Sequence, residues 1–181
     1  MPTSAWIAYF FAVLSVLLAH ELGHWVQMYR LHIPLRRLTL GMGPSLRIYG
    51  RLHVGIFPIG AAVAPDAKAW EAASHVDRFT VAIGGPIASF IFGGVLLAVG
   101  MLYPATLQGL SAMAWMHFVL GMANLVPVPP LDGWVAASEL SAILGRPLSP
   151  FAKEVANRAG SGLLYGLGFY LIGDLVYRAA A

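Results

Sequence analysis

The amino-acid sequence predicts an all-α polytopic membrane protein with about four transmembrane helices and a short membrane-associated β-hairpin between the first two. Charged residues make up 10% of the 181 residues and apolar residues 59%, whereas a typical soluble domain carries about 25% charged residues. No Asp, Glu, Lys or Arg occurs over the 53 residues from Phe79 to Leu131, a stretch long enough for two membrane spans and a turn. This composition excludes a disordered chain, a nucleic-acid-binding protein and a soluble enzyme.

The predicted spans follow from the apolar segments, taken in chain order. We place them at about 4–28, 79–103, 111–126 and 161–177, each near the roughly 20 residues that a helix needs to cross a bilayer. The first segment lacks the basic residues that precede the apolar core of a signal peptide, so we expect it to be retained. Residues 1–181 are therefore predicted to form a single integral-membrane domain in contact with lipid.

The positions of Lys and Arg predict how the chain is oriented. Four spans place the two long connections, about 29–78 and 127–160, on the same side of the membrane. Ten of the eleven Lys and Arg residues lie in these connections, and only Arg178 lies on the opposite side. By the positive-inside rule the connections are cytoplasmic, and both termini are outside. We expect a multi-pass protein, of the kind found in a bacterial inner membrane, whose active site faces the cytoplasmic side.

The first connection contains the predicted hairpin, at about 36–65. From Ser45 to Ile56 apolar residues alternate with polar or small ones around a turn at 49–51, which is typical of paired strands. Pro65-Asp66 then predicts the start of a short helix across 67–76. An amphipathic segment lying on the membrane surface is the alternative interpretation of the alternating pattern.

The segment His20-Glu21-Leu22-Gly23-His24 is the sharpest chemical signal in the sequence. On a helix, positions i and i+4 share one face, so both histidines can direct a ring nitrogen at one metal ion, with Glu21 beside them to accept a proton. Two His and a Glu near one end of a membrane span are costly without a partner. The alternative is a pair of core histidines next to a solvated Glu.

A catalytic zinc site takes three protein ligands and keeps one position open for water. Asp132 is the best third ligand, because it is the only formal charge between Arg78 and Glu139 and follows the third span at the membrane side where the first span also ends. The proline-rich segment 126–130 interrupts the helix before it and exposes backbone. Asp132 could instead cap the helix that follows it. The prediction is one zinc ion per chain, on Asp132 and the two histidines.

These residues resemble the site-2 protease family, the intramembrane zinc metalloproteases of peptidase family M50. Residues 20–24 match its first motif, and residues 124–133 resemble its second, Asn-x-x-Pro-x-x-x-Leu-Asp-Gly, with Asp132 in the position of the third zinc ligand. The segments 84–86 and 57–60 are similar to a recurrent Gly-Pro turn and to the segment after a membrane-re-entrant β-loop. The resemblance spans most of the chain and implies a minimal form, since no PDZ or CBS domain fits in 181 residues.

The resemblance implies hydrolysis of peptide bonds in or near transmembrane segments of membrane-protein substrates, that is, regulated intramembrane proteolysis. Glu21 would act as general base, and Asn124 either as a donor to the developing oxyanion or in a structural hydrogen bond. An extended substrate would pair with the hairpin edge at Leu52, His53 and Val54. The alternative functions are a non-catalytic membrane metalloprotein or pseudoprotease that binds transmembrane partners, and a carrier. The intact Glu21 and the lack of a two-fold repeat argue against them. The sequence predicts no oligomeric state.

Overall fold

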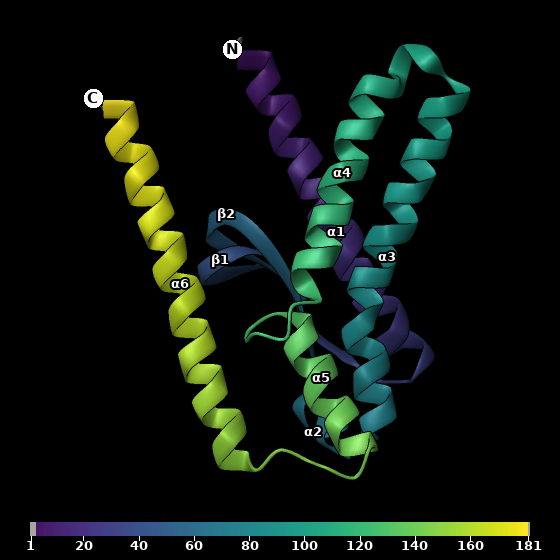
Figure 1. Cartoon of the computed structure of the whole chain (residues 1–181), viewed down its shortest axis with the longest axis vertical. Helices are drawn as coiled ribbons and strands as arrows, with labels where there is room; N and C mark the ends of the chain where they lie inside the picture. The colour runs from purple at the N-terminus through teal and green to yellow at the C-terminus, as the bar shows by residue number, and fades with distance from the viewer. Residues whose placement is uncertain (1–2, 181) are drawn as a thin grey trace.

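The computed structural model describes residues 3–180, and the side chains of that range except those of 3–8, 42, 57–59, 164, 165, 167, 169, 171, 172, 175, 176, 179 and 180. Its elements follow in the order α1 (Thr3–Arg30), β1 (Leu35–Tyr49), β2 (Leu52–Pro65), α2 (Ala67–Ala72), α3 (His75–Leu102), η1 (Pro104–Thr106), α4 (Leu107–Asn124), α5 (Asp132–Ile143) and α6 (Pro150–Ala180) (Figure 1). A mostly helical chain with a small sheet confirms the coarse fold class predicted from the sequence.

Helix α3 is the central element, because α1, α4 and α5 all pack against it. Figure 1 shows α3 and α4 side by side and connected at the top, with α5 continuing below α4. Small residues on the buried face of α3 allow the other helices to approach it closely. A Cβ at Gly23 of α1 would collide with the carbonyl oxygen of Gly84, and a Cβ at Gly93 would lie 2.6 Å from the ring of Phe118 in α4. The glycines of α3 therefore set the helix spacing around the site.

Two helices among the described residues are long and apolar enough to cross a membrane, Tyr9–Arg30 within α1 and His75–Leu102, which is α3. Helix α4 is 18 residues long, near the lower limit for a span. The predicted spans at 111–126 and 161–177, and with them the count of four, therefore stay predictions. Large apolar side chains on the outer faces, such as Phe11, Ile91 and Trp115, are more than half exposed, as expected for contact with lipid.

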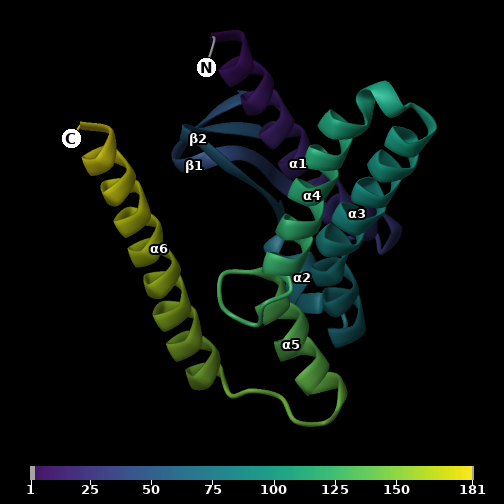
Figure 2. The ribbon, with the colours of Figure 1, turned by 45° about the horizontal axis from the view of Figure 1, so that its top comes forward.

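The hairpin predicted at 36–65 is present, with a turn at Gly50 whose φ of +51° suits glycine, and it is longer than expected. Strands β1 and β2 are antiparallel, but the hairpin also bends over so that its tip returns to its base (Figure 2). The segment 38–40 thereby pairs with 61–63 on one flank and with 52–54 on the other. Residues 52–54 pair in addition with the segment 46–49, so both of their flanks are occupied.

The connection between the hairpin and α3 begins as the sequence predicts and then changes direction. Asp66 caps α2, accepting a hydrogen bond from the Ala69 amide at 3.1 Å. The helix stops at Ala72 rather than running to residue 76, because Ser74 and Asp77 form a capping box that starts α3. Beside this junction lies a small apolar core made of Met28, Ile33 and Val81 with partly buried neighbours that include Trp70.

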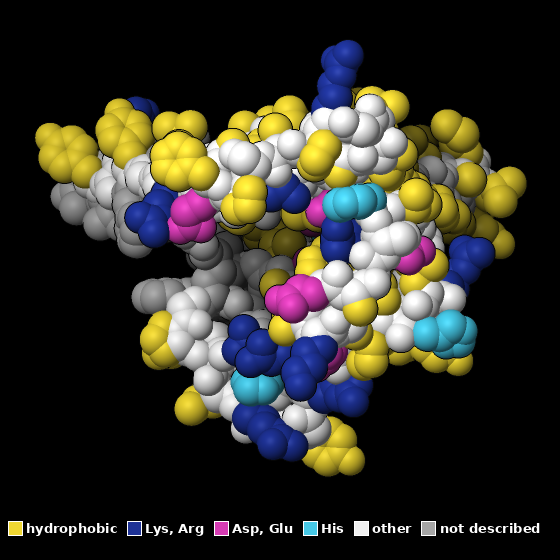
Figure 3. All heavy atoms as spheres, turned by 90° about the horizontal axis from the view of Figure 1, so that it is seen from below, with side chains coloured by type: hydrophobic (Ala, Val, Ile, Leu, Met, Phe, Trp, Pro, Cys, Tyr) yellow, Lys and Arg dark blue, Asp and Glu magenta, His cyan; other side chains and the backbone are white. Residues whose placement is uncertain are grey.

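The chain after α4 positions the last two helices. Residues 125–131 form a proline-containing loop, and α5 starts directly at Asp132. Helix α6 lies to one side of the other helices in both ribbon views (Figures 1 and 2). It approaches the loop at Gly160, where a Cβ would lie 2.7 Å from the carbonyl oxygen of Pro129. Seen from the end where α2, α5 and the start of α6 lie, charged and histidine side chains gather and apolar side chains surround them (Figure 3).

Candidate metal centre

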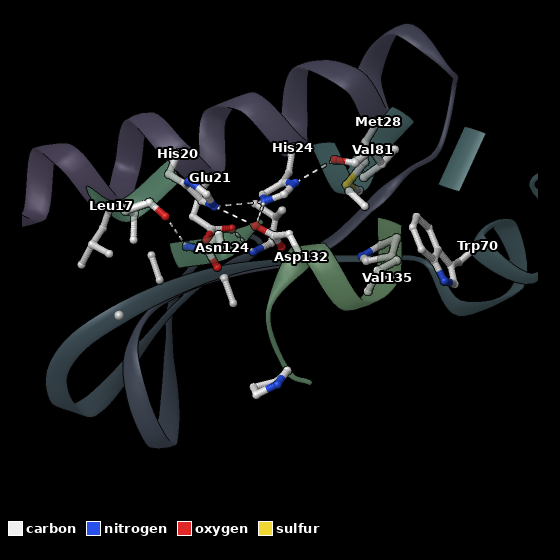
Figure 4. A pocket seen from close by; sticks show the side chains of 18 residues that line it. Leu17, His20, Glu21, His24, Met28, Trp70, Val81, Asn124, Asp132 and Val135 are labelled. Atoms are coloured by element: carbon white, nitrogen blue, oxygen red, sulfur yellow. Dashed lines mark hydrogen bonds and ion pairs between the residues drawn. The ribbon is translucent and has the colours of Figure 1, made fainter. Parts of the chain in front are cut away.

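His20 and His24 lie one turn apart on α1 and are both buried, at 4% and 6% exposure. Their Nε2 atoms are 3.3 Å apart. Asp132, the first residue of α5, brings its Oδ2 atom to 2.9 Å from Nε2 of His20 and 3.2 Å from Nε2 of His24 (Figure 4). Asp132, which is more than 100 residues from the two histidines in sequence, therefore meets them at one point, and the three residues are those that the sequence predicted.

The outer nitrogens of the two rings are also engaged, and this orients the inner ones. Nδ1 of His24 donates to the carbonyl oxygen of Val81 at 2.8 Å, and Nδ1 of His20 lies 2.9 Å from Oγ of Ser89. Because a carbonyl oxygen can only accept, a neutral His24 carries its proton on Nδ1 and directs the Nε2 lone pair at Asp132. Before a metal ion binds, a protonated histidine can instead donate from Nε2 to Oδ2 of Asp132. Burial raises the pKa of Asp132, but hydrogen bonds of this kind outweigh burial and hold that pKa below its usual range.

This donor set fits a divalent metal ion. Tetrahedral ligands about 2.0–2.1 Å from zinc lie roughly 3.3 Å from one another, and the three separations here are 3.3, 2.9 and 3.2 Å. Two imidazole lone pairs and a carboxylate that converge in this way repel one another unless a cation lies between them. The other nitrogen of each ring, Nδ1, is held by a hydrogen bond, as is usual for metal-binding histidines. His20, Glu21 and His24 also offer ligand atoms that all lie within 4.8 Å of one another.

Glu21 is held by the hairpin. Its Oε2 atom accepts a hydrogen bond from the backbone amide of Val63 in β2 at 2.7 Å. The side chain therefore points from α1 towards the strand, next to the two histidines and Asp132 (Figure 4). It is partly buried and has a fixed partner, so the alternative of a freely solvated Glu does not describe this geometry.

Two glycines explain why the site fits between the helices. A Cβ at Gly85 of α3 would collide with Nε2 of His24 and lie 2.6 Å from Nε2 of His20. A Cβ at Gly133 would collide with the carbonyl of Leu125, so glycine lets the first turn of α5 pack against the loop before it. The Gly-Gly-Pro and Leu-Asp-Gly segments therefore contain the glycines that allow Asp132 to approach α1.

The site opens into a cavity of about 430 Å³. Its walls include the four site residues, residues 60–63 of β2, Trp70 and Asn124. Asn124 donates through Nδ2 to the carbonyl oxygen of Leu120 at 3.1 Å, which is the structural hydrogen bond that the sequence analysis kept as an alternative. The amide has a second N–H, so its role towards a substrate stays a prediction.

The hairpin residues predicted to contact a substrate lie elsewhere. Leu52, His53 and Val54 are paired on both flanks and are not among the residues that line the cavity, so they do not form the free strand edge that the sequence analysis expected. Residues 61–63 pair only with 38–40 in the described part of the hairpin, and these residues border the cavity. The difference arises because the hairpin bends over, and a local alternation pattern carries no information on such long-range pairing.

Several contributing residues were not found from the sequence. Nothing in the sequence placed Ser89 at the metal centre, and Val63 was covered there only by the range of the predicted hairpin. Glu139 of α5 is the third: it is 6% exposed and lies 2.6 Å from Nδ1 of His75 and 3.1 Å from Nε of Arg78. Burial raises the pKa of Glu139, but these hydrogen bonds hold it below its usual range.

The sequence of this chain is similar to those of known proteins. The model of peptidase family M50 matches residues 8–109 and 105–167. A putative zinc metalloprotease of Pasteurella multocida is 34% identical over 165 residues, which cover 74% of this chain and 36% of that protein. A zinc metalloprotease of Methanocaldococcus jannaschii is 29% identical over 132 residues, which cover 68% of this chain and 33% of that protein. The chain thus spans about a third of the length of these relatives.

A solved structure shares the fold. The site-2 protease from Methanocaldococcus jannaschii superposes with a TM-score of 0.60 at 26% identity, covering 95% of this chain and 71% of that chain. The resemblance inferred from the two motifs is therefore confirmed. Because the family match extends over most of the sequence and the fold is that of a site-2 protease, the chain belongs to peptidase family M50.

Proposed function

We propose that this protein is a zinc metalloprotease of the membrane that hydrolyses peptide bonds in or near transmembrane segments of other membrane proteins. The observation that carries the proposal is the convergence of Nε2 of His20, Nε2 of His24 and Oδ2 of Asp132 within 3.3 Å of one another, with the carboxylate of Glu21 beside them. The names of relatives in Pasteurella multocida and Methanocaldococcus jannaschii, both zinc metalloproteases, support the same activity.

His20, His24 and Asp132 would hold the ion. A bound zinc ion would supply Lewis acidity there, lowering the pKa of a water molecule towards neutrality and polarising a carbonyl group. Glu21 takes the proton of the attacking water and later delivers it to the nitrogen of the leaving amine. The amide of Val63 holds Oε2 of Glu21 in place, which leaves Oε1 for the proton transfer. Asn124 donates its second N–H to the oxygen of the carbonyl that is attacked.

The free flank of β2 is the substrate-binding edge in this proposal. In an antiparallel ladder the N–H and C=O groups of one residue point to the same flank, and every second residue repeats that direction. The amide of Val63 points away from β1, towards Glu21, so the amide and carbonyl of Ala61 point the same way. A helical substrate hides its carbonyl groups, so the segment to be cut unwinds and pairs with Ala61 as an extra strand.

The proposed location is a membrane in which the site opens towards the cytoplasm. Two apolar helices and the exposed apolar faces of α1, α3 and α4 support insertion in a bilayer. The gathering of Lys and Arg between α1 and α3, and just before and within the first turns of α6, supports the orientation. His20 and Glu21 then lie in the cytoplasmic half of α1, where water reaches them from the cavity.

The test is the Glu21→Gln variant, which keeps the size of the side chain and its hydrogen bond to Val63. Purified wild-type protein, reconstituted with a model transmembrane peptide, is expected to cleave it, and Glu21→Gln to bind zinc with similar affinity but to cut at least about 1,000-fold more slowly. Glu71→Gln, on the exposed surface of α2, is the matched control and retains wild-type rates. Cleavage by Glu21→Gln at the wild-type rate contradicts the general-base role. A wild-type protein that binds zinc but cleaves nothing indicates the non-catalytic alternative.

A further inference from the structure

Glu139 is a buried acid outside the metal centre, and it has basic partners from two other helices. Its Oε2 atom lies 2.6 Å from Nδ1 of His75 and 3.1 Å from Nε of Arg78, both in α3, and its Oε1 atom lies 3.8 Å from Nζ of Lys153 in α6. The side chain of Glu139 is 7% exposed and that of Arg78 15%. A carboxylate this buried is strongly destabilising unless it is paired, so these contacts hold α5 in one place.

The position of Glu139 on α5 relates it to the third ligand. Asp132 and Glu139 are seven residues apart, which is two turns and about 10 Å along the axis, on nearly the same face of the helix. One face of α5 thus makes polar contacts at two points. Asp132 contacts the two histidines of α1, and Glu139 contacts the start of α3. Because α5 packs on α3, the place of Asp132 relative to α1 is set through α3.

Helix α3 also positions the two histidines. It supplies Ser89 to His20 and the Val81 carbonyl to His24, so both histidines take their orientation from the helix on which α5 also packs. Arg78 is fixed in turn, since it donates to the carbonyl oxygens of Trp70 at 3.3 Å and Ala73 at 3.0 Å. Trp70 lines the cavity of the site. The Glu139–Arg78 pair therefore joins α2, α3 and α5 around one cavity.

We propose that Glu139 is a positioning residue for the metal centre: its pairing with Arg78 and His75 fixes α5 so that Oδ2 of Asp132 stays at ligand distance from both histidines. The proposal rests on the metal site of the proposed function and not on proteolysis. It gives a role to the buried carboxylate of Glu139, which takes no part in the proposed hydrolysis.

The experiment measures zinc affinity by chelator competition on the purified full-length chain. Glu139→Gln is expected to weaken zinc binding about 10- to 100-fold, the loss found when groups that orient metal ligands are removed. Glu139→Asp restores the charge with a shorter reach and recovers part of that loss. Arg78→Gln weakens binding as well, and the double variant with Glu139→Gln is no weaker than the worse single variant, since both remove one pair.

Two controls separate positioning from general damage. Glu154→Gln removes an ion pair of the same kind, the exposed contact with Arg158 at 2.6 Å, and leaves zinc affinity unchanged within about twofold. Ser74→Ala removes the capping box at the start of α3 without touching Glu139, and it also leaves affinity within about twofold. Visible spectra of the Co²⁺-loaded protein report ligand geometry, and we expect a changed band for Glu139→Gln only.

Zinc affinity within twofold of wild type in Glu139→Gln overturns the proposal, as does an equal loss in Ser74→Ala. The proposed function fails separately. If the wild-type chain binds zinc but cleaves no peptide, the zinc measurements still decide the role of Glu139. If the wild-type chain cleaves and Glu139→Gln binds zinc normally, the positioning role alone is lost.

Discussion

The cavity has a metal side, formed by His20, Glu21, His24 and Asp132, and a strand side, formed by residues 61–63 of β2. The two sides differ in how many of their polar groups already have hydrogen-bond partners. On the metal side His20, His24 and Glu21 each have a hydrogen-bond partner outside the ligand cluster, and the helix behind them presents a glycine because no larger residue fits. On the strand side, residues 61–63 pair on one flank only and carry small or β-branched side chains. The metal side is therefore held by fixed partners, whereas the strand side keeps one flank open, as the proposed pairing with an extended substrate requires.

The largest effect is expected on the metal side, from Gly85→Ala. The new Cβ would collide with Nε2 of His24, so the rings must move apart and zinc affinity is expected to fall at least about 100-fold. Gly94→Ala, nine residues along the same helix, is the matched control, since its Cβ would meet nothing within 4 Å. Chelator competition on both variants measures this. Normal zinc binding by Gly85→Ala means that α3 does not confine the ligands.

A smaller effect is expected on the strand side, from Ala61→Pro. Proline removes the amide that points towards the free flank, so one backbone hydrogen bond to an extended substrate is lost. We expect kcat/KM to fall about tenfold while zinc affinity stays unchanged. Steady-state cleavage of the model peptide, with zinc content measured in parallel, separates the two sides. A loss of zinc in Ala61→Pro would show that β2 also helps to hold the metal ligands in place.

Acid is expected to weaken the attachment of α5. The pKa of Glu139 is below its ordinary value of 4.5, so the pairing stabilises the folded chain above about pH 4.5. That contribution is lost as the pH falls from 4.5 through the lower pKa of the folded state. Thermal unfolding between pH 3 and 7 is expected to show a steeper decrease of Tm in wild type than in Glu139→Gln. Parallel curves would show that Glu139 does not contribute to this dependence.

The smallest effect is expected at His117, away from both sides of the cavity. Its ring is 3% exposed and stacks on Phe92 with the centroids 5.8 Å apart, and its Nδ1 atom has no hydrogen-bond partner among the described residues. His117→Phe keeps the stacking and removes the unpaired nitrogen, so Tm is expected to stay the same or rise by a few degrees. A marked decrease in Tm, measured by circular dichroism, would show that His117 has a polar partner.

The sequence predicted the parts of this site that depend on local spacing. His20 and His24 share a helix face because they are four residues apart, and the turn of the hairpin follows from the alternation around Gly50. Asp132 could be found because it is isolated in an apolar region. The pairing of Glu139 with Arg78 joins residues 61 positions apart, and no periodic pattern encodes such a contact. The bend of the hairpin, which moves the free edge from 52–54 to 61–63, depends on tertiary pairing in the same way.

The central claim is that two imidazole nitrogens and one carboxylate of this chain hold a single zinc ion. Zinc stoichiometry and X-ray absorption at the zinc edge, on wild type and on Asp132→Ala, test it most directly. We expect one zinc per chain in wild type, with two histidine nitrogens in its coordination shell, and a loss of most of the zinc in Asp132→Ala. Full zinc occupancy in Asp132→Ala, or a wild-type shell without histidine, would contradict the account.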